Sequence, residues 1–450
     1  GGSDGSSRII SHGVKKSMTK KKLLIKNGLL VDPKNEVEFI GSLLVENGII
    51  KEIFNKPSPN YDISDCKIID CKKNVLSPGL IDMWVFAGEP GYEHIETIED
   101  VSNAAKASGI TTIACRPDTN PIIDEAELVQ YIIRKSEDKS QINILPIAAL
   151  TKKHEGKNMT EIGLLKEAGA VGFSDAYNEI NNTNILKNVF TYASNFNAQI
   201  MQLPVSDLDK FGVMNESEIS MRLGLPGIAK ISETIALERE LRIAHHTEVK
   251  YHSMCISTSE SYDVVNKFKD MNDKITCGVS INNLKLNEND VAAYRTFFKV
   301  KPPLRSENDR SYILENLNNE TIDIITSNHE PQGTESKRLP FEEASYGAVG
   351  IETLLAASLS LYHDGYISLS KLIKKMSYNP AKILNLENTG SLEVGKKADL
   401  ILVDLDKPWV CDADKLTTKC KNTTFENQKM QGRVLLTIVN GNIIHNLVDQ

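Results

Sequence analysis

Residues 77–91 read Ser77-Pro-Gly-Leu-Ile-Asp-Met-Trp-Val-Phe-Ala-Gly-Glu-Pro-Gly91, an apolar run enclosed by two Pro-Gly pairs. Pro-Gly pairs mark turns, so the run between them is typical of a buried strand. Side chains at i and i+2 of a strand point to the same face, which places Trp84 beside Phe86. An indole is only a donor and a phenyl ring has no lone pair, so neither can bind a metal ion. Taken alone, this pair is ordinary core.

The composition indicates a globular protein with two parts. The chain has 450 residues, of which 40% are hydrophobic, and this favours one large domain with a small one. A formal net charge of −8 gives no electrostatic footprint for nucleic acid or an anionic membrane. No apolar run approaches the roughly 18 residues that cross a bilayer. We therefore expect neither nucleic acid nor membrane as a partner.

The cysteines and the first residues indicate the compartment and the native start. Seven scattered cysteines without a C-x-x-C pair predict free thiols in a reducing compartment, the cytoplasm. Residues 1–17 lack an apolar signal segment and precede Met18. We interpret them as a disordered leader or cloning remnant, and Met18 as the native start.

Short apolar runs separated by turn residues occupy both ends of the chain. Examples are Leu23-Leu-Ile-Lys-Asn-Gly, Gly41-Ser-Leu-Leu-Val-Glu-Asn-Gly and Val434-Leu-Leu-Thr-Ile-Val-Asn-Gly. Asn-Gly between such runs is a strong signal for a β-hairpin. Because both ends share this pattern of short apolar runs and turns, we predict one small β-sandwich built from residues 18–76 and 387–450.

Between these ends, residues 77–386 alternate strand-like and helical stretches. The strand candidates begin at Thr111, Ile142, Gly169, Gln199, Ile275 and Ile322. Alternating β and α units argue for a parallel sheet, and the size favours a (β/α)8 barrel of the TIM type. Functional residues would then lie at the C-terminal ends of the strands. From periodicity alone, an open doubly wound sheet remains an alternative.

Four ordered blocks carry a family resemblance over roughly residues 22–445. The first is the frame at residues 77–91, matching P-G-x-I-D-x-H-x-H. The others are Met214-Asn-Glu-Ser-Glu-Ile-Ser-Met-Arg-Leu-Gly-Leu-Pro-Gly, Lys299-Val-Lys-Pro-Pro-Leu-Arg-Ser-Glu-Asn-Asp-Arg and Gly347-Ala-Val-Gly-Ile-Glu-Thr. The chain resembles the class I dihydroorotases of the amidohydrolase superfamily. This resemblance implies a barrel with a composite β-sandwich.

The resemblance also shows which metal ligands have changed. Trp84 and Phe86 stand for the two histidines of the first strand, and Leu203 for a third histidine. Cys255 replaces a further histidine, and a lone cysteine cannot make a zinc site. Asp175, at the place of the bridging carboxylate, is the one ligand retained. We therefore expect zinc binding to be lost.

The acid-base and substrate positions have changed as well. Asn328 stands for the aspartate expected to act as general base, and an amide has no useful basicity near pH 7. Gly88 replaces an arginine that pairs with the substrate carboxylate. Asp118 replaces an asparagine, and its charge is expected to repel an anionic substrate. His329 is retained, but without a metal-bound water nearby we expect it to be structural.

The resemblance thus implies a dihydroorotase-like pseudoenzyme of pyrimidine biosynthesis with no catalytic residue retained. The family's metal lowers the pKa of the attacking water and polarises the carbonyl, and no residue replaces it. The expected role is a structural partner of aspartate carbamoyltransferase, in a homo- or hetero-oligomer. This scaffold hypothesis predicts a barrel mouth filled by Trp84, Phe86 and Leu203.

Two other hypotheses remain open. One is an amidohydrolase acting on a cyclic amide with altered or metal-poor chemistry, using a new cluster of Asp118, Asp175, Glu89 and Cys255. The other is a small-molecule sensor that keeps the pocket. The retained blocks around Gly224-Leu-Pro-Gly and Pro302-Pro-Leu-Arg serve either folding or an interface, and loops on a rigid barrel often form contact surfaces.

Overall fold

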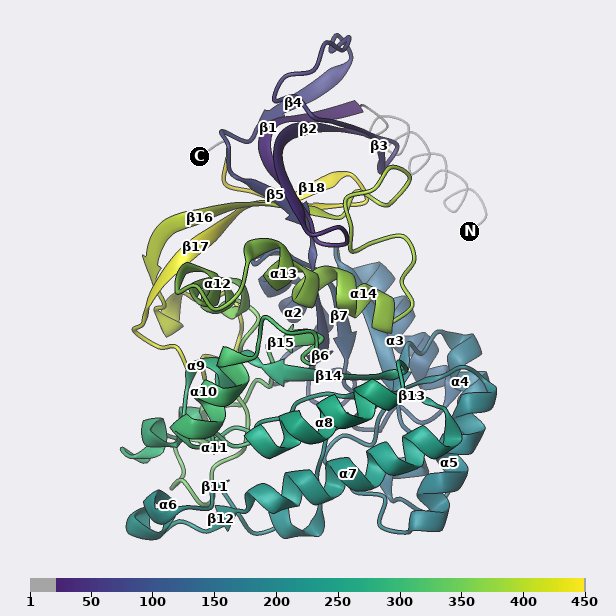
Figure 1. The fold of residues 1–450 in the computed structure, drawn as a ribbon, viewed down its shortest axis with the longest axis vertical. Coiled ribbons are helices and arrows are strands. Elements are labelled where there is room, and N and C mark those ends of the chain that lie inside the picture. Colours follow the sequence, from purple (N-terminus) through teal and green to yellow (C-terminus); the bar gives the residue numbers. More distant parts are fainter. Residues whose placement is uncertain (1–21, 449–450) are drawn as a thin grey trace, which may run out of the picture.

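The computed structural model describes residues 22–448, whose strands form two eight-stranded sheets and one two-stranded sheet, β11 Met214–Asn215 with β12 Gly227–Ile228. Of the two large sheets, one is built from both ends of the chain, at the top of Figure 1, and the other is a parallel barrel below it. The expected leader, residues 1–17, lies outside the described residues.

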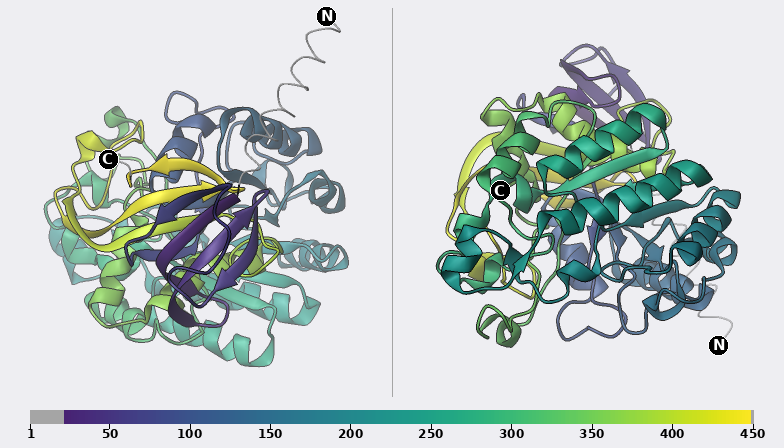
Figure 2. Two further views of the ribbon diagram at one scale, coloured as in Figure 1. Left: turned by 90° about the horizontal axis from the view of Figure 1, so that it is seen from above. Right: turned by 60° about the horizontal axis from the view of Figure 1, so that its bottom comes forward.

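The terminal sheet joins the two ends of the chain through one strand pair. β5 pairs antiparallel with β16, with Leu76 opposite Leu402, and Figure 2 shows purple and yellow strands side by side. The strand order is β18-β17-β16-β5-β1-β2-β3, with β4 on β1. The strands are β1 Lys22–Asp32, β2 Val37–Glu46, β3 Ile49–Phe54, β4 Cys66–Asp70, β5 Val75–Pro78, β16 Leu400–Val410, β17 Lys429–Val439 and β18 Asn442–Asn446.

The Asn-Gly pairs behave in two ways. Asn47-Gly48 joins β2 to β3 and Asn440-Gly441 joins β17 to β18, both with positive φ at each residue, as a tight hairpin turn requires. The hairpin predicted at Asn27-Gly28 is wrong. Asn27 has φ of 57° but lies inside β1, where the register with β2 shifts between Ile25 and Gly28. The pair therefore forms a bulge, because the left-handed residue accommodates an extra residue without reversing the strand.

The central region forms the predicted (β/α)8 barrel. All eight strands pair in parallel in the order β15-β14-β13-β10-β9-β8-β7-β6. They are β6 Leu80–Val85, β7 Ile110–Cys115, β8 Asn143–Ala148, β9 Gly172–Phe173, β10 Gln199–Gln202, β13 Lys250–Ser253, β14 Ile275–Ser280 and β15 Ile324–Thr326. The strand β13 was not among the predicted strand starts.

Contacts between the first and last strands close the barrel and exclude the open sheet. Val85 forms a bridge with His329, and the backbone N–H of Phe86 donates to the His329 carbonyl at 2.9 Å. Asp82, fully buried on β6, accepts hydrogen bonds from the hydroxyls of Thr326, at 2.5 Å, and Ser327. The Asp of the P-G-x-I-D frame therefore has a structural task here.

A helix follows each barrel strand and covers its outside. α2 begins after Thr97, whose side chain accepts from the Asp100 N–H at 3.1 Å while Asp100 caps the Thr97 N–H, a capping box. No helix of residues 22–448 is long and apolar enough to span a membrane. The outer helices are α2 Ile98–Ala107, α3 Ala126–Lys139, α4 Ile162–Ala168, α5 Thr183–Asn195, α7 Lys230–Thr247, α8 Ser259–Met271, α10 Glu307–Glu315 and α12 Leu354–His363.

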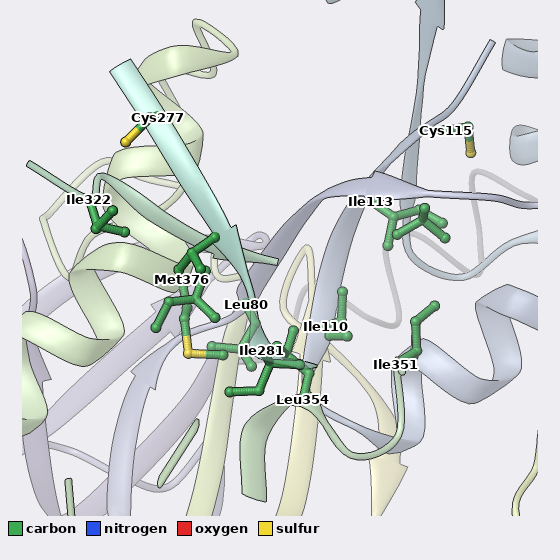
Figure 3. Packing of buried hydrophobic residues seen from close by; sticks show 14 of the residues in the cluster. Leu80, Ile110, Ile113, Cys115, Cys277, Ile281, Ile322, Ile351, Leu354 and Met376 are labelled. Atoms are coloured by element: carbon green, nitrogen blue, oxygen red, sulfur yellow. The ribbon is translucent and has the colours of Figure 1, made fainter. Parts of the chain in front are cut away.

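Two apolar clusters hold the barrel. The larger packs strands against helices, as Leu80, Ile110 and Leu354 do in Figure 3. The second draws residues from β6, β7, β8, β10 and β15, including Trp84 and Met201. Side chains from strands all around a closed barrel can meet only in its interior, so this cluster fills the interior.

Glu240 on α7 makes the stability of this fold depend on pH. It is 2% exposed and accepts a hydrogen bond from the Tyr251 hydroxyl at 3.0 Å. Burial raises its pKa from 4.5 to about 7, so ionising it opposes folding, and stability should fall as pH rises through that value. We expect Glu240→Gln to exceed the wild type by about 3 kcal/mol at pH 8 and to match it near pH 4. Urea denaturation at both pH values tests this; an equal gain at both would contradict it.

Candidate functional site

The positions singled out from the sequence all lie at the C-terminal end of the barrel. Trp84, Leu203 and Cys255 are at most 3% exposed and belong to the same apolar cluster. In full, they are Trp84 and Phe86 at the end of β6, Asp175 after β9, Leu203 after β10, Cys255 after β13 and Asn328 after β15. The fold therefore gathers them at the barrel mouth, where a (β/α)8 enzyme carries its active site.

An arginine that the sequence analysis passed over occupies the centre of this mouth. The guanidinium carbon of Arg116, just after β7, lies 5.2 Å from the ring centre of Trp84, 5.3 Å from Phe86 and 5.0 Å from Tyr177. These are cation–π distances. Arg116 is 2% exposed, and its Nη1 has no hydrogen-bond partner among the described residues. The sequence feature that could have pointed to Arg116 is its position directly after an apolar strand, at the end where functional residues of a barrel lie.

Two carboxylates neutralise this arginine. Asp118 is bound by two parallel hydrogen bonds, Nε to Oδ1 at 3.1 Å and Nη2 to Oδ2 at 2.6 Å, and Glu330 Oε1 lies 2.7 Å from Nη2. Asp118 was expected to repel an anionic substrate, and in the structure its carboxylate pairs with Arg116. Burial alone would raise the pKa of Asp118, but the guanidinium outweighs burial and lowers it. Asp118 is therefore an ionised part of a buried ion pair.

The side chain of Asp175 forms hydrogen bonds with the loop that follows β8. Its Oδ1 accepts from the backbone N–H groups of Leu150 and Thr151, both at 3.0 Å, and its Oδ2 accepts from the Thr151 hydroxyl. His154 Nε2 lies 3.6 Å from Asp175 Oδ1. Burial raises the pKa of Asp175 against these opposing contacts. The retained carboxylate thus has local partners for both oxygens.

The residues after β15 are held in structural contacts. Asn328 donates through Nδ2 to the Lys301 carbonyl at 3.0 Å. His329 is fully buried, with Nε2 2.8 Å from Glu96 Oε2, and its Nδ1 accepts from the Gly350 N–H at 3.0 Å. With Nδ1 as acceptor, the ring proton lies on Nε2 and is donated to Glu96. His329 therefore fastens the barrel closure to the loop before α2.

Gly88 cannot be replaced by the arginine of the family pattern on this backbone. Its φ is +78°, and a Cβ there would lie 2.0 Å from the Glu96 carbonyl oxygen. A left-handed conformation and an overlap with backbone both select glycine. The conformation of this loop therefore leaves no room for an arginine at position 88.

The donors at the mouth do not fit a zinc ion. Among residues 22–448, no three His, Cys, Asp or Glu side chains are placed to share a metal. The proposed new cluster does not form: Glu89 instead accepts from the Ile98 N–H at 2.9 Å and from the Tyr131 hydroxyl at 3.3 Å. Burial raises the pKa of the Cys255 thiol, which disfavours the thiolate that would bind metal.

Little free space remains at the mouth. The cavity beside Tyr177, Leu203, Cys255 and Lys301 has a volume of about 20 Å³. A single buried water needs roughly 10–15 Å³ of such space. The site as folded holds about one water molecule.

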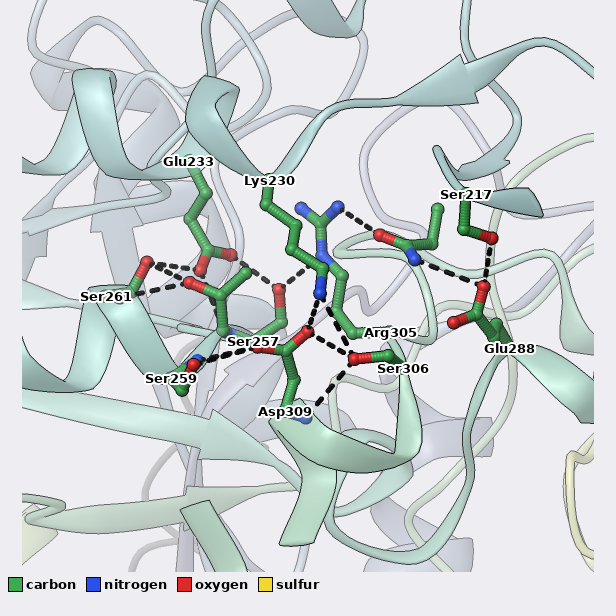
Figure 4. A network of polar contacts seen from close by, with 12 residues as sticks. Ser217, Lys230, Glu233, Ser257, Ser259, Ser261, Glu288, Arg305, Ser306 and Asp309 are labelled. Carbon is green, nitrogen blue, oxygen red and sulfur yellow. Dashed lines mark hydrogen bonds and ion pairs between the residues drawn. The ribbon is translucent and has the colours of Figure 1, made fainter. Parts of the chain in front are cut away.

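The retained sequence blocks meet in a buried polar network (Figure 4). Arg305 is 3% exposed and donates to Ser257 Oγ at 3.0 Å, and to Asn215 Oδ1 and the Ile228 carbonyl, both at 2.9 Å. Asn215 in turn donates to Glu288 at 3.3 Å. Arg305 and Asn215 therefore have a structural role within the fold. From the sequence alone, this role could not be distinguished from a role in an interface.

A second carboxylate completes the network. Glu233, 2% exposed on α7, accepts from the Ser257 N–H and hydroxyl at 3.0 and 2.7 Å and from the Ser261 hydroxyl at 2.6 Å. Nearby, Lys230 pairs with Asp309 at 2.6 Å. These contacts tie the loops after β10, β13 and β14 together, so the mouth loops form one connected layer.

The fold places the chain in a known class. It is similar to L-hydantoinase (dihydropyrimidinase) from Arthrobacter aurescens, with TM-score 0.85 and 22% identity over 95% of this chain and 96% of that one. It is also similar to dihydropyrimidinase from Brevibacillus agri, with TM-score 0.82 and 17% identity over 94% and 95%. Residues 357–445 match the model described as Amidohydrolase family. The barrel with its composite terminal sheet is an amidohydrolase fold.

Sequence comparison names the family within that class. Residues 73–261 match the model described as Dihydro-orotase-like. The chain is 37% identical to a dihydroorotase of Ehrlichia canis over 428 residues, 94% of each chain. It is 37% identical to one of Acetivibrio thermocellus over 424 residues, 94% of this chain and 98% of the relative. The chain belongs to the dihydroorotase family.

Proposed function

We propose that this chain is a non-catalytic member of the dihydroorotase family that acts in pyrimidine biosynthesis as a structural partner of aspartate carbamoyltransferase. One observation carries the proposal: Arg116, stacked on Trp84, Phe86 and Tyr177, fills the place where a substrate and metal would meet. Its ion pairs occupy the carboxylates of Asp118 and Glu330, and its aromatic contacts exclude water.

The remaining space supports the same conclusion. Pockets that enclose a small organic ligand are typically about 300–1,000 Å³, whereas the mouth cavity is about 20 Å³. A six-membered cyclic amide cannot enter without displacing Arg116 or the aromatic rings. Displacing Arg116 would strand Asp118 and Glu330, so the filled mouth resists opening.

The loops at the mouth also offer a surface suited to a protein partner. In the segment between β10 and α7, Phe211 and Met221 are each 79% exposed. Phe and Met are enriched at protein interfaces, so we expect the partner to bind this segment. A scaffold needs this outer surface and a stable barrel, and it does not need the ligands inside.

The first experiment measures metal content and hydrolysis together. Protein purified without chelators should contain less than about a tenth of an equivalent of zinc, because too few ligands remain for a site. Dihydroorotate hydrolysis should stay at the buffer rate with or without added zinc. A family member with intact ligands, assayed in parallel, is the positive control. Near-stoichiometric zinc with turnover would favour the amidohydrolase hypothesis and refute this one.

The second experiment tests the partner. Purified aspartate carbamoyltransferase from the same organism should co-elute with this chain in size-exclusion chromatography. Phe211→Glu combined with Met221→Glu should abolish co-elution. Leu164→Glu, at a position 57% exposed on α4, is the matched control and should leave it intact. Separate elution of the two wild-type proteins would overturn the partnership while leaving the lack of catalysis untouched.

A further inference from the structure

A second and larger cavity lies at the opposite end of the barrel from the mouth. It has a volume of about 370 Å³ and adjoins Asp323, the residue directly before β15. In Figure 1 its helical wall, α13 Leu369–Ile373 and α14 Asn379–Ile383, lies between the barrel and the terminal sheet. The turn between β1 and β2 closes the other side with Lys34 and Glu36. The cavity is therefore a junction between the two sheets.

The lining of this cavity is strongly cationic. Six lysines face three carboxylates across it, in a chain whose net charge is −8. The lysines are Lys34, Lys269, Lys371, Lys374, Lys375 and Lys382, and the carboxylates are Glu36, Glu320 and Asp323. A cavity lined mainly by positive side chains has a positive electrostatic potential, which attracts anions even when the protein as a whole is acidic.

The ion pairs present leave part of this charge uncompensated. Lys34 binds Glu393 at 2.6 Å, Lys269 binds Asp323 at 2.7 Å, and Lys374 lies 3.5 Å from Glu36. Lys371 reaches only the Asn318 carbonyl, at 3.5 Å. The side chain of Lys382 has neither a hydrogen bond nor an ion pair with any residue that the structure describes.

Lys375 adds a buried ammonium to this cationic lining. It is 4% exposed, and its ammonium donates to the carbonyls of Asn319, at 3.0 Å, and Ile322. An ammonium has three protons to donate, so one remains for a ligand. Burial lowers its pKa to about 8, while nearby Asp323 acts in the opposite direction.

Helix geometry adds to the repulsion. Lys371, Lys374 and Lys375 are spaced i, i+3 and i+4 along one continuous helical stretch, α13 and the turn that follows. This spacing places the three ammonium groups on one face, where like charges destabilise a helix. An anion in the cavity would relieve this cost.

We infer that this cavity binds a small molecule through a phosphate group. The cluster of ammonium donors suits a phosphate, and Asn318, Asn319, Asn379 and Tyr378 add neutral hydrogen-bonding groups on the same walls. The volume falls within the range of small-ligand sites and accommodates a sugar phosphate. The inference is independent of the proposed function, because the two sites lie at opposite ends of the barrel.

Isothermal titration calorimetry with ribose 5-phosphate, inorganic phosphate and ribose tests this inference. Ribose 5-phosphate should bind, ribose should not, and added salt should weaken binding. Inorganic phosphate binding as tightly as the ester would show that free phosphate is the ligand; weaker binding would show that the sugar also contributes. Both results support a phosphate site. No heat from either phosphate compound would overturn it.

Point variants locate the site. Lys371→Ala and Lys382→Ala should each weaken binding at least about threefold, the loss of one partly exposed charge contact. Lys187→Ala on α5, an exposed lysine far along the chain from the cavity, is the matched control for net charge and should leave the affinity unchanged. Equal effects of all three variants would mean nonspecific attraction and would refute the site. Thermal unfolding confirms that each variant is folded.

Discussion

Replacing Arg116 by leucine should lower the free energy of unfolding by about 3–5 kcal/mol, the range for breaking a buried ion pair by removing one partner. The side chains of Asp118 and Glu330 are only 19% and 10% exposed and would lose their counterion. Trp84, Phe86 and Tyr177 would lose the cation that covers their faces. Urea denaturation followed by fluorescence measures the loss.

Two comparisons separate this effect from a general loss of charge. Arg242→Leu removes an exposed ion pair with Glu238 on α7, whose side chains are 64% and 37% exposed, and should cost less than about 0.5 kcal/mol. In the Arg116→Leu background, adding Asp118→Asn and Glu330→Gln should recover part of the loss, because no buried charge then remains. A loss at Arg116 no larger than that at Arg242 would contradict the role assigned to the ion pair.

The pH dependence of the same variant supplies an internal check. Burial already raises the pKa of Glu330 even with Arg116 beside it. Without Arg116, both Asp118 and Glu330 would protonate more readily, and protonation removes the cost of burying their charge. The destabilisation of Arg116→Leu should therefore shrink as pH falls from 8 to 5. A constant difference would assign the loss to packing alone.

Restoring the two missing histidines should not restore a zinc site. In the variant Trp84→His with Phe86→His, Leu203 and Asn328 still offer no anionic or imidazole ligand, and Arg116 remains nearby. We expect less than about a tenth of an equivalent of zinc. The variant should also lose about 3 kcal/mol or more of stability, because Trp84 is fully buried in an apolar cluster and large-to-small core changes cost that much.

Elemental analysis and urea denaturation test both parts of this prediction. Tyr366→His, at a position 39% exposed, introduces a histidine outside the core and should change stability by less than about 0.5 kcal/mol. Stoichiometric zinc in the double variant would show that the remaining residues can still assemble a site. That result would contradict the view that the whole mouth has been rebuilt.

Several features of this protein could be predicted from sequence because they depend on local chemistry. The alternation of strands and helices predicted the barrel. The similar patterns at the two ends predicted one small β unit built from both, which was expected to be a sandwich and is a single sheet in the structure. The side chains of Trp84, Phe86 and Leu203 lack metal-binding atoms in any fold. These conclusions depend only on residue type and spacing, so they do not depend on which residues meet in the folded chain.

Other features could not be predicted because they depend on which residues meet. The partner of Asp118 could not be predicted, because the sequence does not show that the side chain of Arg116, two residues earlier, binds its carboxylate. Asn27-Gly28 has the sequence of a hairpin turn, yet the strand pairing of β1 made it a bulge. The blocks around Asn215 and Arg305 were ambiguous until their burial in one network was known.

The sequence by itself determined that this chain has an amidohydrolase framework in which most positions of the family's metal ligands hold other residue types, because ligand chemistry belongs to each side chain separately. Only the tertiary structure decided what surrounds these positions: a buried arginine held by three aromatic rings and two carboxylates. It likewise gathered lysines from five segments around one cavity. Both arrangements join residues far apart in sequence, and their energies arise from burial and proximity, which exist only once the chain has folded.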